Sequence, residues 1–402
     1  MNNAFIPFHL PSIGQEEVEE VTATLLSGWL TSGPRTAQFE REFREYVHAP
    51  FAQAVNSCTA GLHLALAALG VGPGDEVITT PLTFCATVHS ILHVGATPVL
   101  ADTGLDGNID PDSIAERITE RTRAILPVHL GGAPCDMTAI WALARRNGLF
   151  VIEDAAHAVG AHFGPSPIGG GSPASGNCSD AVAFSFYATK NLTTGEGGMV
   201  TTHSQSVAEK MKSLCLHGIS KDAWNRYAEK GNWYYEVIEQ GFKYNLSDIQ
   251  SAIGIHQLRK QEAFRKIRAQ YADLYRQALS DVAEVDVPIE REGTRSAWHL
   301  YPLRLNLDQL AIDRGEFIRE LTEKRIGTSV HFIPIPLHPY FECHPGLAKS
   351  SCPTALALYP RLVSLPLYPA MTESQVQFVA ESIKEIVHRV KISTSVAMAA
   401  GH

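Results

Sequence analysis

The sequence contains no Cys-x-x-Cys pair. Its seven cysteines are scattered along the chain, at positions 58, 85, 135, 178, 215, 343 and 352. An odd number of cysteines without close pairs argues against a disulfide framework and against a zinc site. We therefore expect no metal, and reduced thiols in a cytoplasmic protein.

Basic residues are also few and dispersed. Lys and Arg total 33 against 42 Asp and Glu, which gives a net charge of -9. Because no Lys/Arg-rich run is interleaved with aromatic residues, we expect no nucleic-acid partner. No apolar run approaches the roughly 18 residues of a membrane span. The N-terminus lacks the basic and apolar regions of a signal peptide, so we expect a soluble, unprocessed protein without a membrane partner.

The chain does have enough apolar sequence for a large core. It has 402 residues, of which 45% are hydrophobic and 19% are charged, values typical of a soluble globular protein. This length exceeds the usual size of one domain, so we expect one large domain and a smaller one. No internal repeat is present.

Short apolar runs alternate with amphipathic segments in the first half of the chain. This alternation is typical of a parallel α/β sheet, here over residues 54–205. We expect strands at residues 52–55, 76–79, 98–101, 124–128, 149–152 and 181–186, and helices at 59–69, 85–93 and 135–147.

The second half reads as an α+β domain. A long charge-rich helix is expected over 248–275, then a strand at 298–305, a helix at 314–324 and a strand at 328–332. The last helix is marked by Thr372 and Gln375, which have the spacing of a capping box, and by apolar residues on one face behind them. The Ala/Ser/Gly-rich tail from 393 to 402 is expected to be frayed.

Two residues follow neighbouring predicted strands and carry complementary chemistry. Asp154 ends one apolar strand, and Lys190 lies just past the end of the next. Ligands gather at the carboxyl ends of such strands. Pyridoxal phosphate (PLP) requires a lysine amine for its aldehyde and a carboxylate for its pyridine nitrogen, and this pair supplies both. On spacing alone, a capping aspartate and a solvated lysine remain the alternative.

The phosphate and the pyridine ring of PLP would each need further residues to bind them. Ser57 and Thr59 lie between a strand and a helix, where backbone N–H groups and the helix dipole attract phosphate. The same residues could simply cap the helix. Phe84 follows another strand and could stack on a pyridine ring, or it could belong to the core.

Longer motifs resemble a known family. The chain is similar to the sugar aminotransferases of the DegT/DnrJ/EryC1/StrS family, and most of all to members of the UDP-4-amino-4-deoxy-L-arabinose–oxoglutarate type. The resemblance extends over nearly the whole chain and rests on residues 151–158 (VIEDAAHA), 184–198 (FSFYATKNLTTGEGG), 241–251 (GFKYNLSDIQS), 27–34 (SGWLTSGP) and 331–338.

The resemblance implies the fold type I architecture of PLP enzymes. It has a large domain with a mixed, mostly parallel seven-stranded sheet and a smaller α+β C-terminal domain. In this chain they would span 1–253, with an N-terminal arm, and 254–402. The family works as a homodimer with active sites shared between subunits.

The resemblance also implies roles for individual residues. Lys190 matches the lysine that forms the aldimine with PLP, and Asp154 the partner of the pyridine nitrogen. The other cofactor-binding positions are Ser57, Thr59, Ala60 and Ser185 at the phosphate, Phe84 on the ring, His157 near the ring hydroxyl, and Asn245 reaching the phosphate of the neighbouring subunit.

The implied reaction has two halves. Glutamate donates its nitrogen to give the pyridoxamine form (PMP), which then aminates a keto group, expected at C4, of a nucleotide-linked sugar. Lys190 would serve as the general base, since a buried lysine has a lowered pKa. Substrate contacts would come from His217, Trp224, Arg226 and His331, although a histidine such as His331 could also be a satisfied core residue.

Other interpretations have to be weighed against this one. A sugar dehydratase of this family carries His where the transferases carry Lys, so Lys190 favours transamination. Iron–sulfur relatives need a cysteine cluster, which the scattered cysteines do not provide. An amino-acid PLP enzyme, or a PLP-binding regulator without turnover, is the other possibility.

One segment departs from the family pattern. Residues 164–177 (GPSPIGGGSPASGN) form a longer and more Gly/Pro/Ser-rich connection than usual. This composition predicts a mobile surface loop, which could gate the site or be an inert insertion.

Overall fold

A computed structural model describes residues 4–219, 234–342, 344 and 346–392. Its strands are β1 (Phe51–Val55), β2 (Glu76–Thr79), β3 (Thr97–Leu100), β4 (Thr122–Leu126), β5 (Phe150–Asp154), β6 (His162–Phe163), β7 (Ser166–Pro167), β8 (Ala181–Ser185), β9 (Gly198–Thr202), β10 (Val285–Asp286), β11 (Thr294–Arg295), β12 (Tyr301–Leu305) and β13 (Leu362–Leu365). Its α-helices are α1 (Gln15–Ser27), α2 (Pro34–Val47), α3 (Cys58–Ala68), α4 (Cys85–His93), α5 (Pro111–Arg117), α6 (Met137–Asn147), α7 (Gln205–Cys215), α8 (Asp248–Ala278), α9 (Arg314–Glu323), α10 (Pro353–Leu358) and α11 (Glu373–Val390).

The described residues contain a seven-stranded sheet in the order β1-β9-β8-β5-β4-β2-β3. Strand β9 runs antiparallel to both β1 and β8, and the other neighbouring strands are parallel. The predicted α/β class and the mixed, mostly parallel sheet are therefore confirmed. The sheet begins and ends within a few residues of the predicted range.

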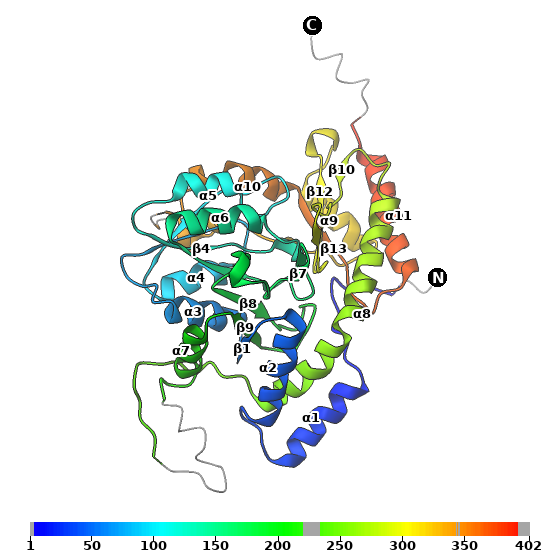
Figure 1. Cartoon of the computed structure of the whole chain (residues 1–402). Helices are drawn as coiled ribbons and strands as arrows, with labels where there is room; N and C mark the ends of the chain where they lie inside the picture. The colour runs from blue at the N-terminus through cyan, green and yellow to red at the C-terminus, as the bar shows by residue number, and fades with distance from the viewer. Residues whose placement is uncertain (1–3, 220–233, 343, 345, 393–402) are drawn as a thin grey trace.

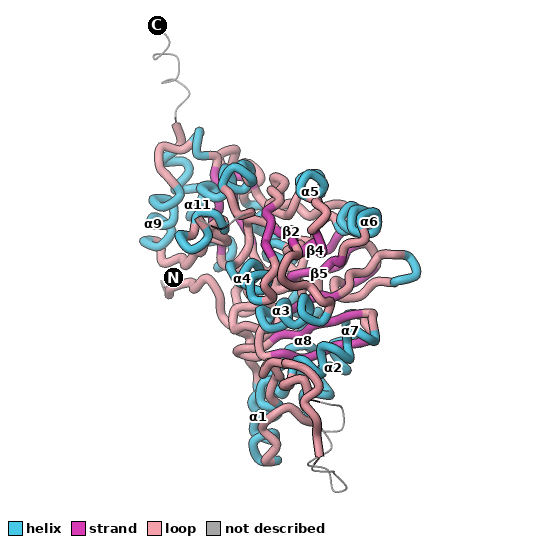
Figure 2. The backbone as a smooth tube through the Cα atoms, turned by 90° about the vertical axis from the view of Figure 1, so that its left-hand side faces the viewer, coloured by secondary structure: helices cyan, strands magenta, loops and turns pink. Residues whose placement is uncertain are grey.

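Helices cover both faces of this sheet (Figures 1 and 2). Alternate residues of a strand point to opposite faces, so each buried strand needs two apolar sides. Ile152 packs in the cluster formed with α3 and α7, whereas its neighbour Val151 packs in the cluster formed with α6. Phe184 of β8 packs with Phe39 and Phe43 of α2. The result is a three-layer α/β/α unit.

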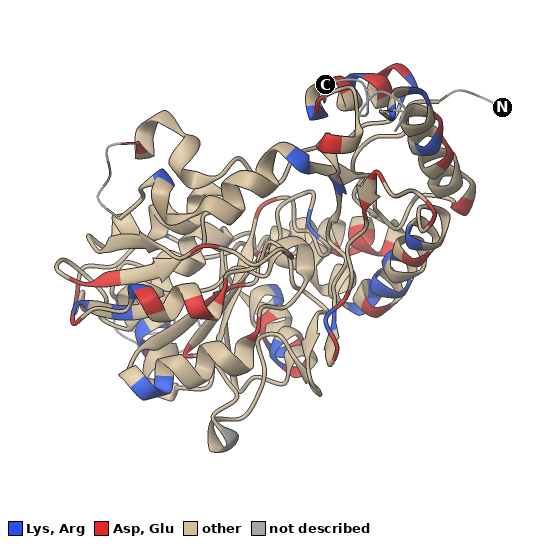
Figure 3. Ribbon diagram, turned by 90° about the horizontal axis from the view of Figure 1, so that it is seen from above, with Lys and Arg blue, Asp and Glu red and all other residues tan. Residues whose placement is uncertain are grey.

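A smaller unit is built from the antiparallel sheet β10-β12-β13. Helices α9 and α11 and the second half of α8 cover it, and the buried set includes Tyr275, Phe317 and Ile383. Ile6 of the N-terminal segment joins the same core. Acidic and basic positions are interspersed along the helices near the two termini (Figure 3), as expected for faces turned to solvent.

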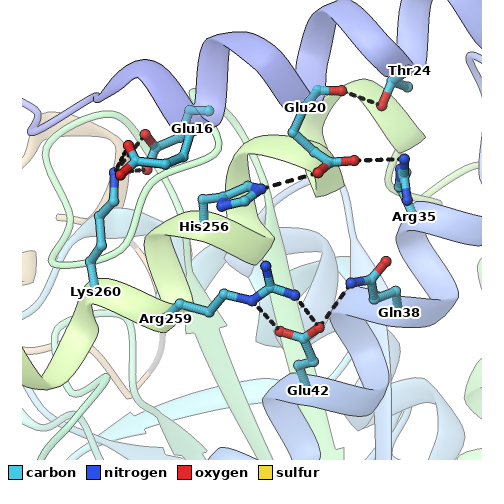
Figure 4. Close-up of polar contacts among 10 residues, drawn as sticks. Glu16, Glu20, Thr24, Arg35, Gln38, Glu42, His256, Arg259 and Lys260 are labelled. Atoms are coloured by element: carbon cyan, nitrogen blue, oxygen red, sulfur yellow. Dashed lines mark hydrogen bonds and ion pairs between the residues drawn. The ribbon is translucent and has the colours of Figure 1, made fainter.

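Helix α1 is tied to the rest of the molecule by a polar network (Figure 4). Lys260 of α8 binds both Glu16 and the buried Glu17 of α1, at 2.9 and 2.8 Å. Glu20 binds Arg35 of α2 and His256 of α8. This network fixes α1, α2 and α8 relative to one another.

Helix α8 also crosses the predicted domain boundary at 253/254. Its first half packs on the large sheet through Ile255 and Leu258, and its second half belongs to the smaller core. Residues from α10 and the preceding turns pack back on the large sheet unit, for example Cys352 against Leu82. The division into 1–253 and 254–402 stays a prediction.

Two sequence predictions differ from the structure. The strand predicted at 328–332 is wrong, because the segment has a single bridge, Ser329 to Ser364, and β13 occupies the place beside β12. The loop predicted at 164–177 is partly regular: β7 pairs with β6, Ile168 is buried, and Gly169 accepts a hydrogen bond from Thr201. The tail from 393 to 402 lies outside the described residues, and no helix in the described part of the chain is long and apolar enough to cross a membrane.

Candidate active site

A cavity of about 530 Å³ opens at the carboxyl edge of the large sheet. Parallel strands end there side by side, so residues that follow different strands meet. Asp154 ends β5, Ser185 ends β8, and Lys190 follows five residues later. All three side chains line the cavity, which confirms that the sheet brings the predicted acid and lysine together.

Asp154 is buried and held in a fixed orientation. Its Oδ2 accepts a hydrogen bond from the Thr87 hydroxyl at 2.8 Å, and its Oδ1 accepts the Ala156 backbone N–H at 3.1 Å. Burial raises the pKa of this carboxyl, while these donors and the charge of Lys190 act in the opposite direction. A buried acid of this kind is stabilised as an anion by a cation placed against it.

The neighbouring acid, Glu153, has a different environment. It pairs with His129 at 2.7 Å, and both side chains are buried outside the cavity wall. His129 Nδ1 accepts the Cys135 backbone N–H, so Nε2 carries a proton and donates it to Glu153. Of the two carboxylates that end β5, Asp154 is therefore the one available to a ligand.

Lys190 lies on the cavity wall in a turn that begins at Tyr187. Burial lowers the pKa of Lys190 to about 8, against the opposing effect of the Asp154 carboxylate. A lysine with this pKa has a substantial neutral fraction near neutral pH. It can therefore act both as a nucleophile and as a base.

The N-terminus of α3 lies at the same cavity. Ser57 caps this helix by accepting the Ala60 backbone N–H at 3.1 Å, so the capping role is real. Ser57, Thr59 and Ser185 line the cavity, whereas Ala60 does not. The first amides of a helix have no intrahelical partner, so this end can also receive an anion.

Phe84 faces open space rather than the core. It lines the cavity and is 61% exposed, and its ring centroid lies 6.2 Å from that of Phe332. The alternative that Phe84 belongs to the hydrophobic core is therefore excluded. A flat apolar face is available for a ring at this position.

Three histidines lie on the wall, and two of them were predicted. His157 and His331 line the cavity as expected, and His299 is an addition from the segment before β12. His331 Nδ1 lies 2.9 Å from the Ser364 hydroxyl, and its ring stacks on Phe8 of the N-terminal segment at 5.4 Å. Burial lowers the pKa of His331 to about 4, so the ring is neutral at physiological pH.

Other predicted residues lie elsewhere. His217 is exposed and does not line this cavity. Asn245 lines a different cavity, where its Nδ2 donates to the Ser32 hydroxyl at 2.8 Å and its Oδ1 accepts from Lys243. Trp224 and Arg226 lie outside the described residues.

Sequence reasoning missed Thr87, His299, Phe8 and Phe332 at this cavity. Thr87 had a usable signal, because it lies one helical turn after Phe84 and so on the same face of α4. The other three come from segments far away in the chain. No local pattern marks them.

Comparison with known proteins agrees with this geometry. Residues 11–384 match the DegT/DnrJ/EryC1/StrS aminotransferase family. The chain belongs to this family. The spore coat polysaccharide biosynthesis protein SpsC of Bacillus subtilis is 49% identical over 387 residues, which cover 96% of this chain and 98% of SpsC.

Solved structures give the same result. The sugar aminotransferase Spr1654 of Streptococcus pneumoniae matches with a TM-score of 0.88 in both its PLP form and its PMP form, at 31% and 32% identity, over 96% of this chain and 99% of that one. PseC of Helicobacter pylori, an aminotransferase involved in the biosynthesis of pseudoaminic acid, matches with a TM-score of 0.86 at 29% identity, over 96% of this chain and all of PseC (100%). The protein is thus a PLP-dependent sugar aminotransferase.

The residues at the cavity fit PLP. The buried carboxylate of Asp154, the lysine of lowered pKa and the helix end at Thr59 are the three kinds of group that the cofactor requires, and all border one space. When bound, PLP supplies an electron sink for breaking bonds at the carbon that carries the amino group.

Proposed function

We propose that this aminotransferase moves an amino group from glutamate to the C4 keto group of a nucleotide-linked sugar, as a cytoplasmic homodimer with shared active sites. The observation that carries the proposal is the placement of Lys190 and Asp154 on the wall of one cavity beside the N-terminus of α3. A lysine at position 190 favours transamination over dehydration.

Each residue has a task in this proposal. Asp154 would hold the proton on the pyridine nitrogen of PLP, and the Thr87 hydroxyl orients its carboxylate. Ser57, Thr59 and Ser185, which line the cavity, would bind the phosphate, and Phe84 would lie against the ring. Lys190 anchors the cofactor.

Lys190 is also the base. Its Nζ takes the proton from the α-carbon of glutamate in the first half reaction. In the second half reaction it delivers a proton to the sugar carbon that receives the nitrogen. A pKa of about 8 suits both directions, because the neutral base and the protonated acid are both accessible near neutral pH.

Substrate contacts are assigned to His331, His217, Trp224 and Arg226. His331 has the strongest support, because it lines the cavity and its neutral ring can bind a hydroxyl or carbonyl. His217 does not line this cavity, and Trp224 and Arg226 lie outside the described residues.

Two observations support the homodimer. Asn245 does not line the cavity that holds Lys190 in its own subunit, so a role at the phosphate would have to be played in a partner's cavity. Large apolar side chains are also exposed near α1 and near the cavity, including Leu26 at 84%. Such surface is normally covered by another protein.

The proposal is tested by spectroscopy and by substrate screening. The purified enzyme should show the absorbance of PLP bound to lysine and lose it on addition of glutamate, and keto-sugar nucleotides should restore it. Lys190→Ala should remove both the absorbance and turnover. Lys384→Ala, which removes a surface lysine paired with Asp281, should change neither.

If glutamate does not remove the absorbance of lysine-bound PLP, the proposed amino donor is wrong. If only sugars without a nucleotide restore that absorbance, the proposed acceptor is wrong. Shared sites are tested separately, by mixing inactive Lys190→Ala and Asn245→Ala subunits. Partial activity should return. No recovery after demonstrated subunit exchange would contradict the shared site.

A further inference from the structure

Two histidine rings lie against each other on the cavity wall. The ring centroids of His157 and His299 are 4.3 Å apart with an interplanar angle of 38°. His157 follows β5 of the large sheet, and His299 precedes β12 of the smaller sheet. Both side chains are buried and both line the cavity that holds Lys190.

Hydrogen bonds determine the tautomer of His157. Its Nδ1 lies 3.2 Å from the backbone nitrogen of Gly131, which can only donate. Nδ1 therefore accepts, and the proton of the neutral ring lies on Nε2. His157 thus has an N–H donor available at Nε2.

His299 is held in the opposite tautomer. Asn191, the residue after Lys190, donates from Nδ2 to the Ala297 carbonyl at 2.8 Å, which fixes the orientation of its amide. Its Oδ1 then lies 3.1 Å from His299 Nδ1 and accepts from it. His299 keeps its proton on Nδ1 and has an acceptor at Nε2.

The surrounding groups disfavour a charge on either ring. Burial is the main cause that holds the pKa of both histidines well below the usual value, and Lys190 and His331 act in the same direction on both. Arg268 of α8 adds to this effect on His299, as does His157. The Asp154 carboxylate lies on the same wall, but its bonds go to Thr87 and Ala156.

We propose that Asn191 is a positioning residue for His299: it holds the proton of a neutral His299 ring on Nδ1, the tautomer opposite to the one that Gly131 fixes in His157 beside Lys190. Proton exchange near neutral pH then belongs to Lys190 rather than to a histidine. The partner of His299 is an amide, and this choice matters: a carboxylate in the same place would stabilise an imidazolium. The inference rests on the proposed role of Lys190.

The test is the isosteric change Asn191→Asp. Its carboxylate would face His299 Nδ1 and favour the charged ring. That ring lines the cavity with Lys190, whereas residue 191 does not, so the positive charge is the nearer one and disfavours protonation of the cofactor–lysine linkage. We expect the midpoint of the pH titration of visible absorbance to fall by roughly one to two pH units. The readout is spectroscopic and does not depend on turnover.

Asn108→Asp is the matched control. Asn108 is also buried, and its Oδ1 accepts the Leu130 backbone N–H instead of a histidine. It does not line this cavity, so its change should leave the midpoint in place. The double variant Asn191→Asp/His299→Gln should not show this fall, because the ring that faces position 191 is gone.

Two results would overturn the inference: a shift in Asn191→Asp no larger than in Asn108→Asp, or a shift that persists in the double variant. Either leaves the proposed function intact so long as the wild-type enzyme shows the lysine-bound absorbance and Lys190→Ala loses it. Retained absorbance in Lys190→Ala would instead refute the proposed function.

Discussion

The hydroxyl of Thr87 is the sharpest place to perturb the cofactor site without touching the lysine. It donates to Asp154 Oδ2 at 2.8 Å, and it accepts in turn from the Thr83 hydroxyl at 2.7 Å. Both threonines are buried, so water does not replace a lost bond easily. Thr87→Val keeps the shape of the side chain and removes the donor.

The expected magnitude follows from the charge on the acceptor. A hydrogen bond to a charged group contributes about 1.5–3 kcal/mol, and about 1.4 kcal/mol corresponds to a factor of ten. The pKa of Asp154 should rise, because Thr87 is the strongest of the interactions that lower it. We therefore expect Thr87→Val to weaken PLP binding roughly tenfold to hundredfold.

Equilibrium titration of the apoenzyme with PLP measures this effect, followed by absorbance or by quenching of protein fluorescence. Ser90→Ala is the control, because Ser90 is a buried residue of the same helix whose hydroxyl donates to the Thr87 carbonyl. It should lower thermal stability without changing PLP affinity. If Thr87→Val binds PLP within threefold of the wild type while folded, the reasoning about Asp154 is wrong.

Three further outcomes can be checked. With a pKa of about 8, Lys190 in the apoenzyme is roughly a tenth neutral at pH 7, so the rate of PLP capture, measured by stopped flow, should rise with pH and level off above about pH 8. Gly132→Ala should lower the melting temperature and PLP affinity, because Gly132 has φ +92 and an added Cβ would lie 2.8 Å from the His157 carbonyl oxygen. Burial raises the pKa of Glu17, but hydrogen bonds from Lys260 and Gln257 outweigh this effect, so the pKa is lowered on balance. Glu17 therefore stabilises the fold above about pH 4, and this stabilisation is lost as the pH falls further. In Glu17→Gln, the loss of unfolding free energy at acid pH should be smaller than in the wild type.

The sheet and its carboxyl-edge residues could be predicted from sequence because the signals are local. Strand β2 and helix α4 were predicted with the bounds that the structure has. The side chains of Asp154 and Lys190 meet because parallel strands end at one edge, which is a general property of the fold. Topology alone therefore predicted that they share a cavity.

The cavity residues from outside the large sheet could not be predicted in this way. His299, Phe8 and Phe332 reach the cavity from the smaller unit and the N-terminal segment, and their places depend on packing between elements far apart in the chain. The segment around Phe332 shows the difficulty. Its apolar composition predicted a strand, but β13 pairs with β12 and leaves this segment to line the cavity.

The cavity residues from the large sheet and those from other segments therefore differ in chemistry. The large sheet supplies the groups that PLP requires, which are an acid, an amine and a helix end, whatever sugar is bound. Segments outside this sheet supply Phe8, His299 and His331, which are uncharged aromatic rings and line the same cavity. Because none of these three side chains carries a fixed charge, an anionic part of the substrate gains no counter-ion from them. In the proposed reaction, the cations for a nucleotide diphosphate or a glutamate carboxylate would then have to come from residues other than these three. In the proposed dimer, a second subunit that brings Asn245 and Lys243 to the cavity would provide one of them.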